Sequence, residues 1–270
     1  MISRPAPGAE TTDPEVRLDV RGEVAELVLA GGHRSNAIDL DVGRRLAAVT
    51  ERLTALTDVR AVLIHAEGTH FCVGGDVHAF AAHEADLASY VGQVADVVHA
   101  AHRHLAALTV PVVCAAQGAV AGAGVGLAFG ADLVLLGRSA KVRLAYTAIG
   151  LSPDNGASAL LSRLVGPRRA LELALTNRTL SADEARDWGL ATAVVDDAVL
   201  LEEARALAGR LAGMAPGALA ATKRLVLAAA GTSRDEQLDD EARAITALAA
   251  TDTAREAISA FARRRPGVVR

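Results

Sequence analysis

Aromatic side chains and lysine are both scarce in this chain. Only 3% of its 270 residues are Phe, Trp or Tyr, although 51% are hydrophobic, so its core must be built mainly from Ala, Val and Leu. The only two lysines are Lys141 and Lys223, and the formal net charge is -4. A nucleic-acid-binding domain usually carries a basic stripe, and none is present, so we expect no nucleic-acid partner.

Cysteine is also rare, and its placement argues against metal or disulfide chemistry. Cys72 and Cys114 lie far apart, which gives neither a metal-ligand spacing nor a disulfide framework and fits a reducing cytoplasm. His99 and His102 could share a helix face, but no third ligand is evident, so we expect no metal site. Residues 1–14 have no apolar signal-peptide core and read as a disordered lead-in to a cytoplasmic protein.

Charge is absent from one long segment, residues 105–131, which could span a bilayer on length alone. Pro111 and Gln117 interrupt it, and the glycines at 118, 122, 124 and 126 make it a poor isolated helix. Residues 110–116 instead read as a buried strand that leads into a turn. We therefore expect no membrane span.

The order of predicted elements indicates an α/β fold. Strand patterns over 16–20, 24–29, 61–65 and 112–116 are separated by helical patterns, including a long one over 84–107. Such alternation favours parallel strands. We predict a lead at 1–14, a catalytic core at 15–196 and a helical C-terminal extension at 197–270. We expect Leu200, Leu201, Leu207 and Leu211 to need a partner surface.

Two glycine-rich turns each follow a buried strand, at residues 71–77 and 117–126. Glycine lets the backbone approach a ligand closely, and two converging N–H groups can form an oxyanion hole. Ordinary tight turns are the alternative. A dinucleotide fingerprint fails because Leu127 or Phe129 stands where its third glycine belongs.

Both turns, in this order, resemble those of the crotonase (enoyl-CoA hydratase/isomerase) superfamily, and the resemblance extends from about Val16 to Pro266. It implies a spiral of ββα units with a helical C-terminal extension. The segments that carry it are residues 34–38 (RSNAI), 71–76 (FCVGGD), 117–133 (QGAVAGAGVGLAFGADL), 149–158 (IGLSPDNGAS), 188–195 (WGLATAVV) and 261–266 (FARRRP).

The resemblance implies a set of site residues. The backbone N–H groups of Gly75 and Ala123 would form the oxyanion hole, the second at a helix N-terminus that also favours negative charge. Asp76 would hold its loop. Arg263–Arg265 could reach a CoA phosphate, although each charged side chain could equally be a solvated surface group. The candidate substrate and CoA contacts are His33, Arg34, Ala37, Val73, Gly74, Gly122, Tyr146 and Lys223.

The residues favour isomerisation over hydration. Hydration uses two carboxylates, but Gly126 and Tyr146 stand at the matching positions. Asp154 lies where isomerases of the superfamily carry an acidic residue, and it could move a proton between two carbons of an enoyl-CoA. Asp154 could also merely cap the following helix.

Three further alternatives stay open. They are another CoA-thioester enolate reaction, such as ring-opening with Tyr146 as acid or decarboxylation, an atypical hydratase, and a catalytically silent CoA-binding or assembly subunit. The resemblance also implies a homotrimer or a dimer of trimers. It implies no cofactor, because coenzyme A is part of the acyl-CoA substrate.

Overall fold

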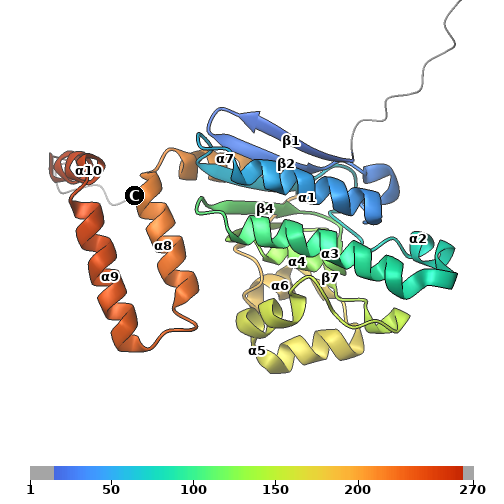
Figure 1. Cartoon of the computed structure of the whole chain (residues 1–270). Helices are drawn as coiled ribbons and strands as arrows, with labels where there is room; N and C mark the ends of the chain where they lie inside the picture. Colours follow the sequence, from blue (N-terminus) through green and yellow to red (C-terminus); the bar gives the residue numbers. More distant parts are fainter. Residues whose placement is uncertain (1–14, 264–270) are drawn as a thin grey trace, which may run out of the picture.

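A six-stranded sheet forms the frame of the molecule (Figure 1). The computed structural model describes residues 15–263. The strand order is β1-β2-β3-β4-β6-β9, with β1 and β2 antiparallel and every other neighbouring pair parallel. The strands are β1 (Val16–Arg21), β2 (Val24–Leu29), β3 (Ala61–Ala66), β4 (Val112–Ala116), β6 (Leu133–Gly137) and β9 (Ala193–Val195).

A second, smaller sheet stands beside the first, in the order β5-β7-β8. Its strands are β5 (Ala119–Ala121), β7 (Lys141–Arg143) and β8 (Leu180–Ser181). The chain passes from β4 directly to β5 and from β6 to β7, and Cys72 bridges Val120 in the same direction after β3. Each turn of the chain therefore contributes a segment to both sheets before a helix returns it. This is the predicted spiral of ββα units.

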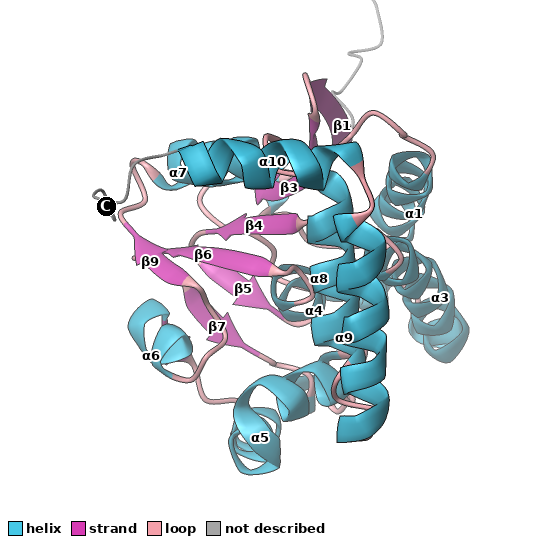
Figure 2. Ribbon diagram, turned by 90° about the vertical axis from the view of Figure 1, so that its left-hand side faces the viewer, coloured by secondary structure: helices cyan, strands magenta, loops and turns pink. Residues whose placement is uncertain are grey.

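Helices cover both faces of the large sheet (Figure 2). The central strands β3 and β4 are buried almost throughout, which explains their continuous apolar runs. The predicted long helix begins at Leu87, because Glu84–Asp86 forms a short 3-10 turn. The helices of the core are α1 (Leu40–Thr54), α2 (Val77–Ala82), α3 (Leu87–Ala106), α4 (Ala123–Phe129), α5 (Ala157–Thr176), α6 (Ala182–Asp187) and α7 (Leu200–Ala212).

Helix α7 belongs to the packed core. Leu200 is 4% exposed, and Leu201, Leu207 and Leu211 pack against the same cluster on the large sheet. The Arg205 guanidinium donates to both carboxylate oxygens of Glu26 on β2, at 2.9 and 2.8 Å. The expectation that these leucines need a partner surface is therefore wrong, because they already have one in the same chain.

The last three helices stand off from this core (Figure 1). They are α8 (Pro216–Ala228), α9 (Arg234–Ala249) and α10 (Asp252–Arg263), and we call residues 216–263 the C-terminal arm. Lys223 ties the arm to the core, because its Nζ donates to Val110 O at 3.0 Å and lies 2.8 Å from Asp132 Oδ2. No helix within residues 15–263 is long and apolar enough to cross a membrane.

Candidate active site

The two glycine-rich turns touch each other. Gly74 has a φ of +94° and Gly122 a φ of +52°. Residues other than glycine rarely adopt a backbone conformation with such a positive φ. A Cβ on Gly74 would lie 3.1 Å from Ala121 O and 3.2 Å from Gly122 Cα. Both positions therefore require glycine, and the contact brings the backbone that follows each turn to one place.

Gly75 and Ala123 follow the touching glycines and line one cavity of about 300 Å³. The backbone on either side of Gly75 is fixed, because Ile38 N donates to Gly74 O and Asp76 N donates to Ile38 O. Within residues 15–263, neither the Gly75 nor the Ala123 N–H is given to a protein acceptor. Ala123 is the first residue of α4, so its N–H is one of those that a helix leaves unpaired. These two donors are available to an oxyanion in the cavity.

The rest of the cavity wall is mainly apolar, as an acyl chain requires. It comes from the two turns, from α3 and from the segment between β7 and α5. Its apolar side chains include Ile38, Val73, Val77, Phe80, Val94, Val98, Leu144, Ile149 and Leu151.

Asp154 is the only carboxylate that lines this cavity in the part of the chain the structure describes. Its Oδ1 accepts the Tyr146 hydroxyl at 2.6 Å and the Asn155 side-chain amide, also at 2.6 Å. Its Oδ2 faces His99 Nε2 at 3.6 Å. Helix α5 has Gly156 as its N-cap and no side-chain capping bond. The capping interpretation of Asp154 is therefore wrong.

The Tyr146 hydroxyl donates a hydrogen bond to Asp154 and so helps to fix the position of the carboxylate. Burial raises the pKa of Tyr146 well above its usual value, and the neighbouring Asp154 charge raises it further, so the phenol keeps its proton. Ala145 and Asn155 adopt left-handed backbone with φ of +63° and +53°. An alanine in this conformation is strained, and such strain clusters at functional sites. Here the two residues adjoin Tyr146 and Asp154.

At position 126, where a hydratase of the superfamily would carry a carboxylate, neighbouring atoms occupy the space for a side chain. A Cβ on Gly126 would lie 2.7 Å from Asn155 O and 3.2 Å from His102 Cε1. Burial lowers the pKa of His102 to about 4, so this imidazole is neutral near pH 7. Neither a carboxylate nor the space for one is present there.

Arg34 and Asp76 form part of the support beneath the first turn. Arg34 Nη2 lies 2.7 Å from Asp39 Oδ2 and 3.0 Å from Asp76 Oδ2. Asp76 also caps α2 by accepting the N–H groups of His78 and Ala79. These contacts fit the expectation that Asp76 holds its loop.

Several proposed CoA contacts lie outside the cavity. The His33 side chain is 71% exposed, Ala37 is buried beside the cavity wall, and Lys223 lies on the C-terminal arm. Arg263 ends α10, while Arg264 and Arg265 lie outside the described residues. Contact of His33, Arg34, Ala37 and Lys223 with CoA stays a prediction. Val73, Gly74, Gly122 and Tyr146 do line the cavity, and their contact with substrate also stays a prediction.

His99 and Asn155 also belong to this site, although the sequence pattern did not predict them. Asn155 N–H donates to His99 Nε2 at 3.2 Å, which links α3 to the loop before α5. The signal was weak, because a histidine on an amphipathic helix is usually only a surface or core residue. His99 was considered only as a metal ligand, and no cluster of metal-binding side chains occurs in residues 15–263.

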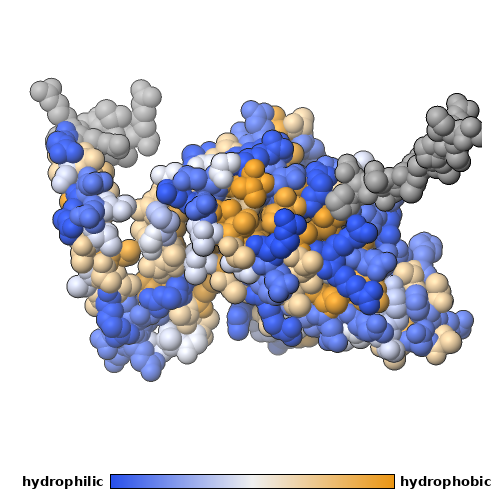
Figure 3. Space-filling view, turned by 45° about the horizontal axis from the view of Figure 1, so that its top comes forward, coloured by the Kyte–Doolittle hydropathy of each residue, from blue (hydrophilic) through white to orange (hydrophobic). Residues whose placement is uncertain are grey.

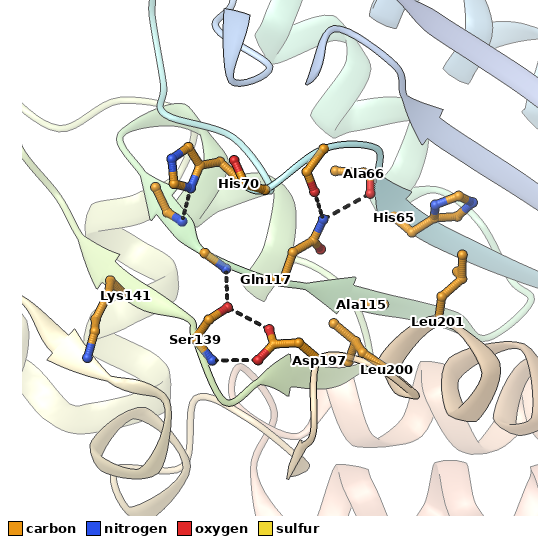
Figure 4. A pocket seen from close by; sticks show the side chains of 14 residues that line it. His65, Ala66, His70, Ala115, Gln117, Ser139, Lys141, Asp197, Leu200 and Leu201 are labelled. Carbon is orange, nitrogen blue, oxygen red and sulfur yellow. Dashed lines mark hydrogen bonds between the residues drawn. The ribbon is translucent and has the colours of Figure 1, made fainter. Parts of the chain in front are cut away.

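A larger cavity of about 710 Å³ lies at the corner where the chain passes from one sheet to the other (Figure 4). Its polar groups are largely paired with one another. Gln117 donates to Ala66 O and Gly68 O at 3.0 Å, and the Ser139 hydroxyl donates to Asp197. Neither Gly75 nor Ala123 lines this larger cavity, whereas both line the smaller one. The smaller cavity is therefore the better candidate for enolate chemistry.

Known proteins share both this fold and this sequence. The sequence profile of the enoyl-CoA hydratase/isomerase family matches residues 19–268. The 1,2-epoxyphenylacetyl-CoA isomerase of Escherichia coli is 35% identical over 243 residues, which cover 90% of this chain and 93% of that protein. A crystal structure described as an enoyl-CoA hydratase/isomerase of Mycobacterium abscessus is 37% identical, with a TM-score of 0.88 over 91% of this chain and 95% of the other. A Thermobifida fusca structure described as an enoyl-CoA hydratase in complex with acetoacetyl-CoA is 33% identical, with a TM-score of 0.81 over 88% and 95%.

The fold is a spiral of ββα units, and Gly75 and Ala123, whose N–H groups have no protein acceptor within residues 15–263, line a mainly apolar cavity. This combination fits a class of enzymes that stabilise an oxyanion with backbone donors. The chain belongs to the enoyl-CoA hydratase/isomerase, or crotonase, family. It is an enzyme of that family and acts on acyl-CoA thioesters.

Proposed function

We propose that this enzyme is an acyl-CoA isomerase that shifts a double bond in an enoyl-CoA thioester. The observation that carries the proposal is Asp154, the only carboxylate among the described residues that line the cavity, which Gly75 and Ala123 also line. One base suffices for isomerisation, because the proton that leaves one carbon returns to another.

The reaction follows from this arrangement. The thioester carbonyl oxygen accepts the N–H groups of Gly75 and Ala123. Asp154 removes a proton from C2 of a 3-enoyl-CoA, and the electrons of that C–H bond move into a dienolate whose oxygen the two donors hold. The protonated Asp154 then gives a proton to C4, and the double bond ends between C2 and C3. Tyr146 and Asn155 orient the carboxylate through Oδ1, which leaves Oδ2 for the proton.

Ring-opening isomerisation is the second candidate, because one relative that covers most of the chain is named a 1,2-epoxyphenylacetyl-CoA isomerase. It would use the same donors, with Tyr146 placed to act as an acid. A panel of CoA thioesters followed by mass spectrometry and chromatography separates the two candidates. Conversion of a 3-enoyl-CoA to its 2-enoyl isomer supports the first, and conversion of only an epoxide substrate supports the second.

Hydration of crotonyl-CoA should be slow or absent. Gly126 and Tyr146 replace the two carboxylates, and Asn155 and His102 fill the space beside Gly126. Loss of the enoyl-thioester absorbance would measure the rate. Turnover near the typical enzyme value of about 10 per second would contradict the assignment of Asp154 as the single base.

We also propose that the chain assembles into a trimer or a dimer of trimers through its C-terminal arm. Apolar residues lie exposed along the arm, as Figure 3 shows beside the core. They include Val226, Leu227, Leu238, Ile245, Ile258 and Phe261, which are 53–75% exposed. A patch of this kind usually marks an interface.

Light scattering at micromolar concentration should therefore give the mass of three or six chains. Ile245→Glu should shift the population toward smaller species, because it buries a charge in the proposed interface. Val20→Glu, at a 52% exposed position on β1, is the matched control and should leave the mass unchanged. A monomer for the unaltered chain would contradict the proposed assembly.

A further inference from the structure

His99 adjoins the proposed base but lies outside the residues that line the cavity. It sits on α3, and its Nε2 is 3.6 Å from Asp154 Oδ2. Asp154 and Asn155 line the cavity, whereas His99 is not among the lining residues. The side chains of His99 and Asp154 are 35% and 34% exposed, and an acyl chain in the cavity would cover Asp154, which lines it, but not His99.

The hydrogen bond from Asn155 makes His99 Nε2 an acceptor. Asn155 N–H donates to His99 Nε2 at 3.2 Å, and a ring nitrogen that accepts a hydrogen bond carries no proton. In the tautomer that accepts this hydrogen bond, the ring proton is on Nδ1. Two acceptors, Nε2 and Asp154 Oδ2, then face each other across 3.6 Å with no proton between them.

The contact between His99 Nε2 and Asp154 Oδ2 becomes favourable when Asp154 takes a proton from the substrate. Tyr146 and Asn155 both occupy Oδ1, so the incoming proton goes to Oδ2. A protonated Oδ2 is a donor that faces the acceptor Nε2, and a small movement closes 3.6 Å to hydrogen-bonding distance.

We propose that His99 is a relay residue that passes the proton of Asp154 to and from solvent while the acyl group fills the cavity. In this step the Oδ2–H bond breaks and the Nε2–H bond forms, which leaves a carboxylate and an imidazolium. Asn155 N–H gives up its bond to Nε2, and Nδ1–H releases its proton to water. The reverse sequence returns a solvent proton to Asp154. The inference rests on the proposed isomerase function.

Neighbouring titratable groups do not supply this route. His102 lies one turn further along α3; burial lowers its pKa to about 4, and its buried Nε2 has no hydrogen-bond partner within residues 15–263. Tyr146 keeps its proton because burial and the Asp154 charge raise its pKa. Among the titratable groups His99, His102 and Tyr146, His99 is the one that has an acceptor atom 3.6 Å from Oδ2 and a partly exposed side chain.

The test is the origin of the proton in the product. A 3-enoyl-CoA is isomerised in D₂O by the wild-type enzyme and by His99→Gln, and mass spectrometry measures deuterium in the product during initial turnover. Glutamine keeps an acceptor for Asn155 N–H but cannot carry a proton to solvent. We expect substantial deuterium with the wild type and at least about a threefold smaller fraction with His99→Gln, while kcat falls less than about tenfold.

Two further variants make the result specific. His104→Gln changes a histidine on the same helix that contacts Thr50 rather than Asp154, and it should match the wild type. His99→Asn removes the relay with a shorter side chain and should behave as His99→Gln does. Thermal melting confirms that each variant is folded.

Each other outcome overturns the relay. Equally high deuterium content in the wild-type and folded His99→Gln products means that Asp154 exchanges with water without His99. A wild-type product with almost no deuterium means that Asp154 returns the substrate proton and that no relay operates. Loss of turnover in both folded His99 variants also contradicts the relay, because internal proton return needs no solvent exchange. If the wild type turns over no 3-enoyl-CoA, the isomerase proposal itself fails and the relay fails with it.

Discussion

Asp154→Asn should abolish most of the isomerisation of a 3-enoyl-CoA while leaving the fold intact. Asparagine can still accept the Tyr146 hydroxyl, but it cannot accept and return a proton. We expect kcat to fall by about 100-fold or more, the usual contribution of a positioned acid–base group. The measurement is the rate of conversion to the 2-enoyl isomer.

The control for this variant is Asp196→Asn, which removes a carboxylate that is 72% exposed and pairs only with Arg138 on the surface. It should keep wild-type activity. Because Asp154 does not cap α5, Asp154→Asn should also melt close to the wild type. Full activity of folded Asp154→Asn would remove Asp154 as the base and leave Tyr146 as the next candidate.

Gly75→Val should disable the oxyanion hole. The Cβ would lie 2.7 Å from the Phe80 ring at Cζ, so the turn or the ring must move, and the branched side chain would displace the N–H donor. Loss of one such donor typically lowers kcat by about 100- to 1,000-fold. The measurement is kcat on the same 3-enoyl-CoA, with circular dichroism to verify folding.

Gly209→Val provides the matched control, because Gly209 lies on α7 with no atom within 4 Å of its Cβ position. The same side chain at that position should leave the rate unchanged. A folded Gly75→Val enzyme with full activity would place the oxyanion donors elsewhere.

Much of the fold and of the candidate site could be predicted from local sequence patterns. The glycines at 74 and 122 could be recognised because a close backbone approach permits no side chain, and the structure places them in contact. Asp154 was predicted because the resemblance places an acidic residue of the superfamily's isomerases at this position. Both inferences depended on short stretches whose chemistry is visible in the residue types.

The remainder depended on contacts between distant segments. Nothing in the pattern of α3 shows that His99 meets Asn155, 56 positions away. The leucines of α7 have the same amphipathic spacing whether they pack on the chain's own sheet or on a partner, so the sequence could not assign their contact. The capping interpretation of Asp154 failed because the two residues after it turn left-handed, which places the start of α5 beyond its reach.

The crowding around Gly126 has a consequence for how this enzyme could change its chemistry. A glutamate at position 126 would press its first carbon against Asn155 O, a backbone atom next to Asp154, and against His102. Accommodating it would displace the loop that holds the existing base. A second carboxylate therefore cannot be gained here by one substitution without disturbing the first. An evolutionary or engineered path from this active site to a two-carboxylate one would therefore need changes at the neighbours of Gly126 as well as at Gly126 itself.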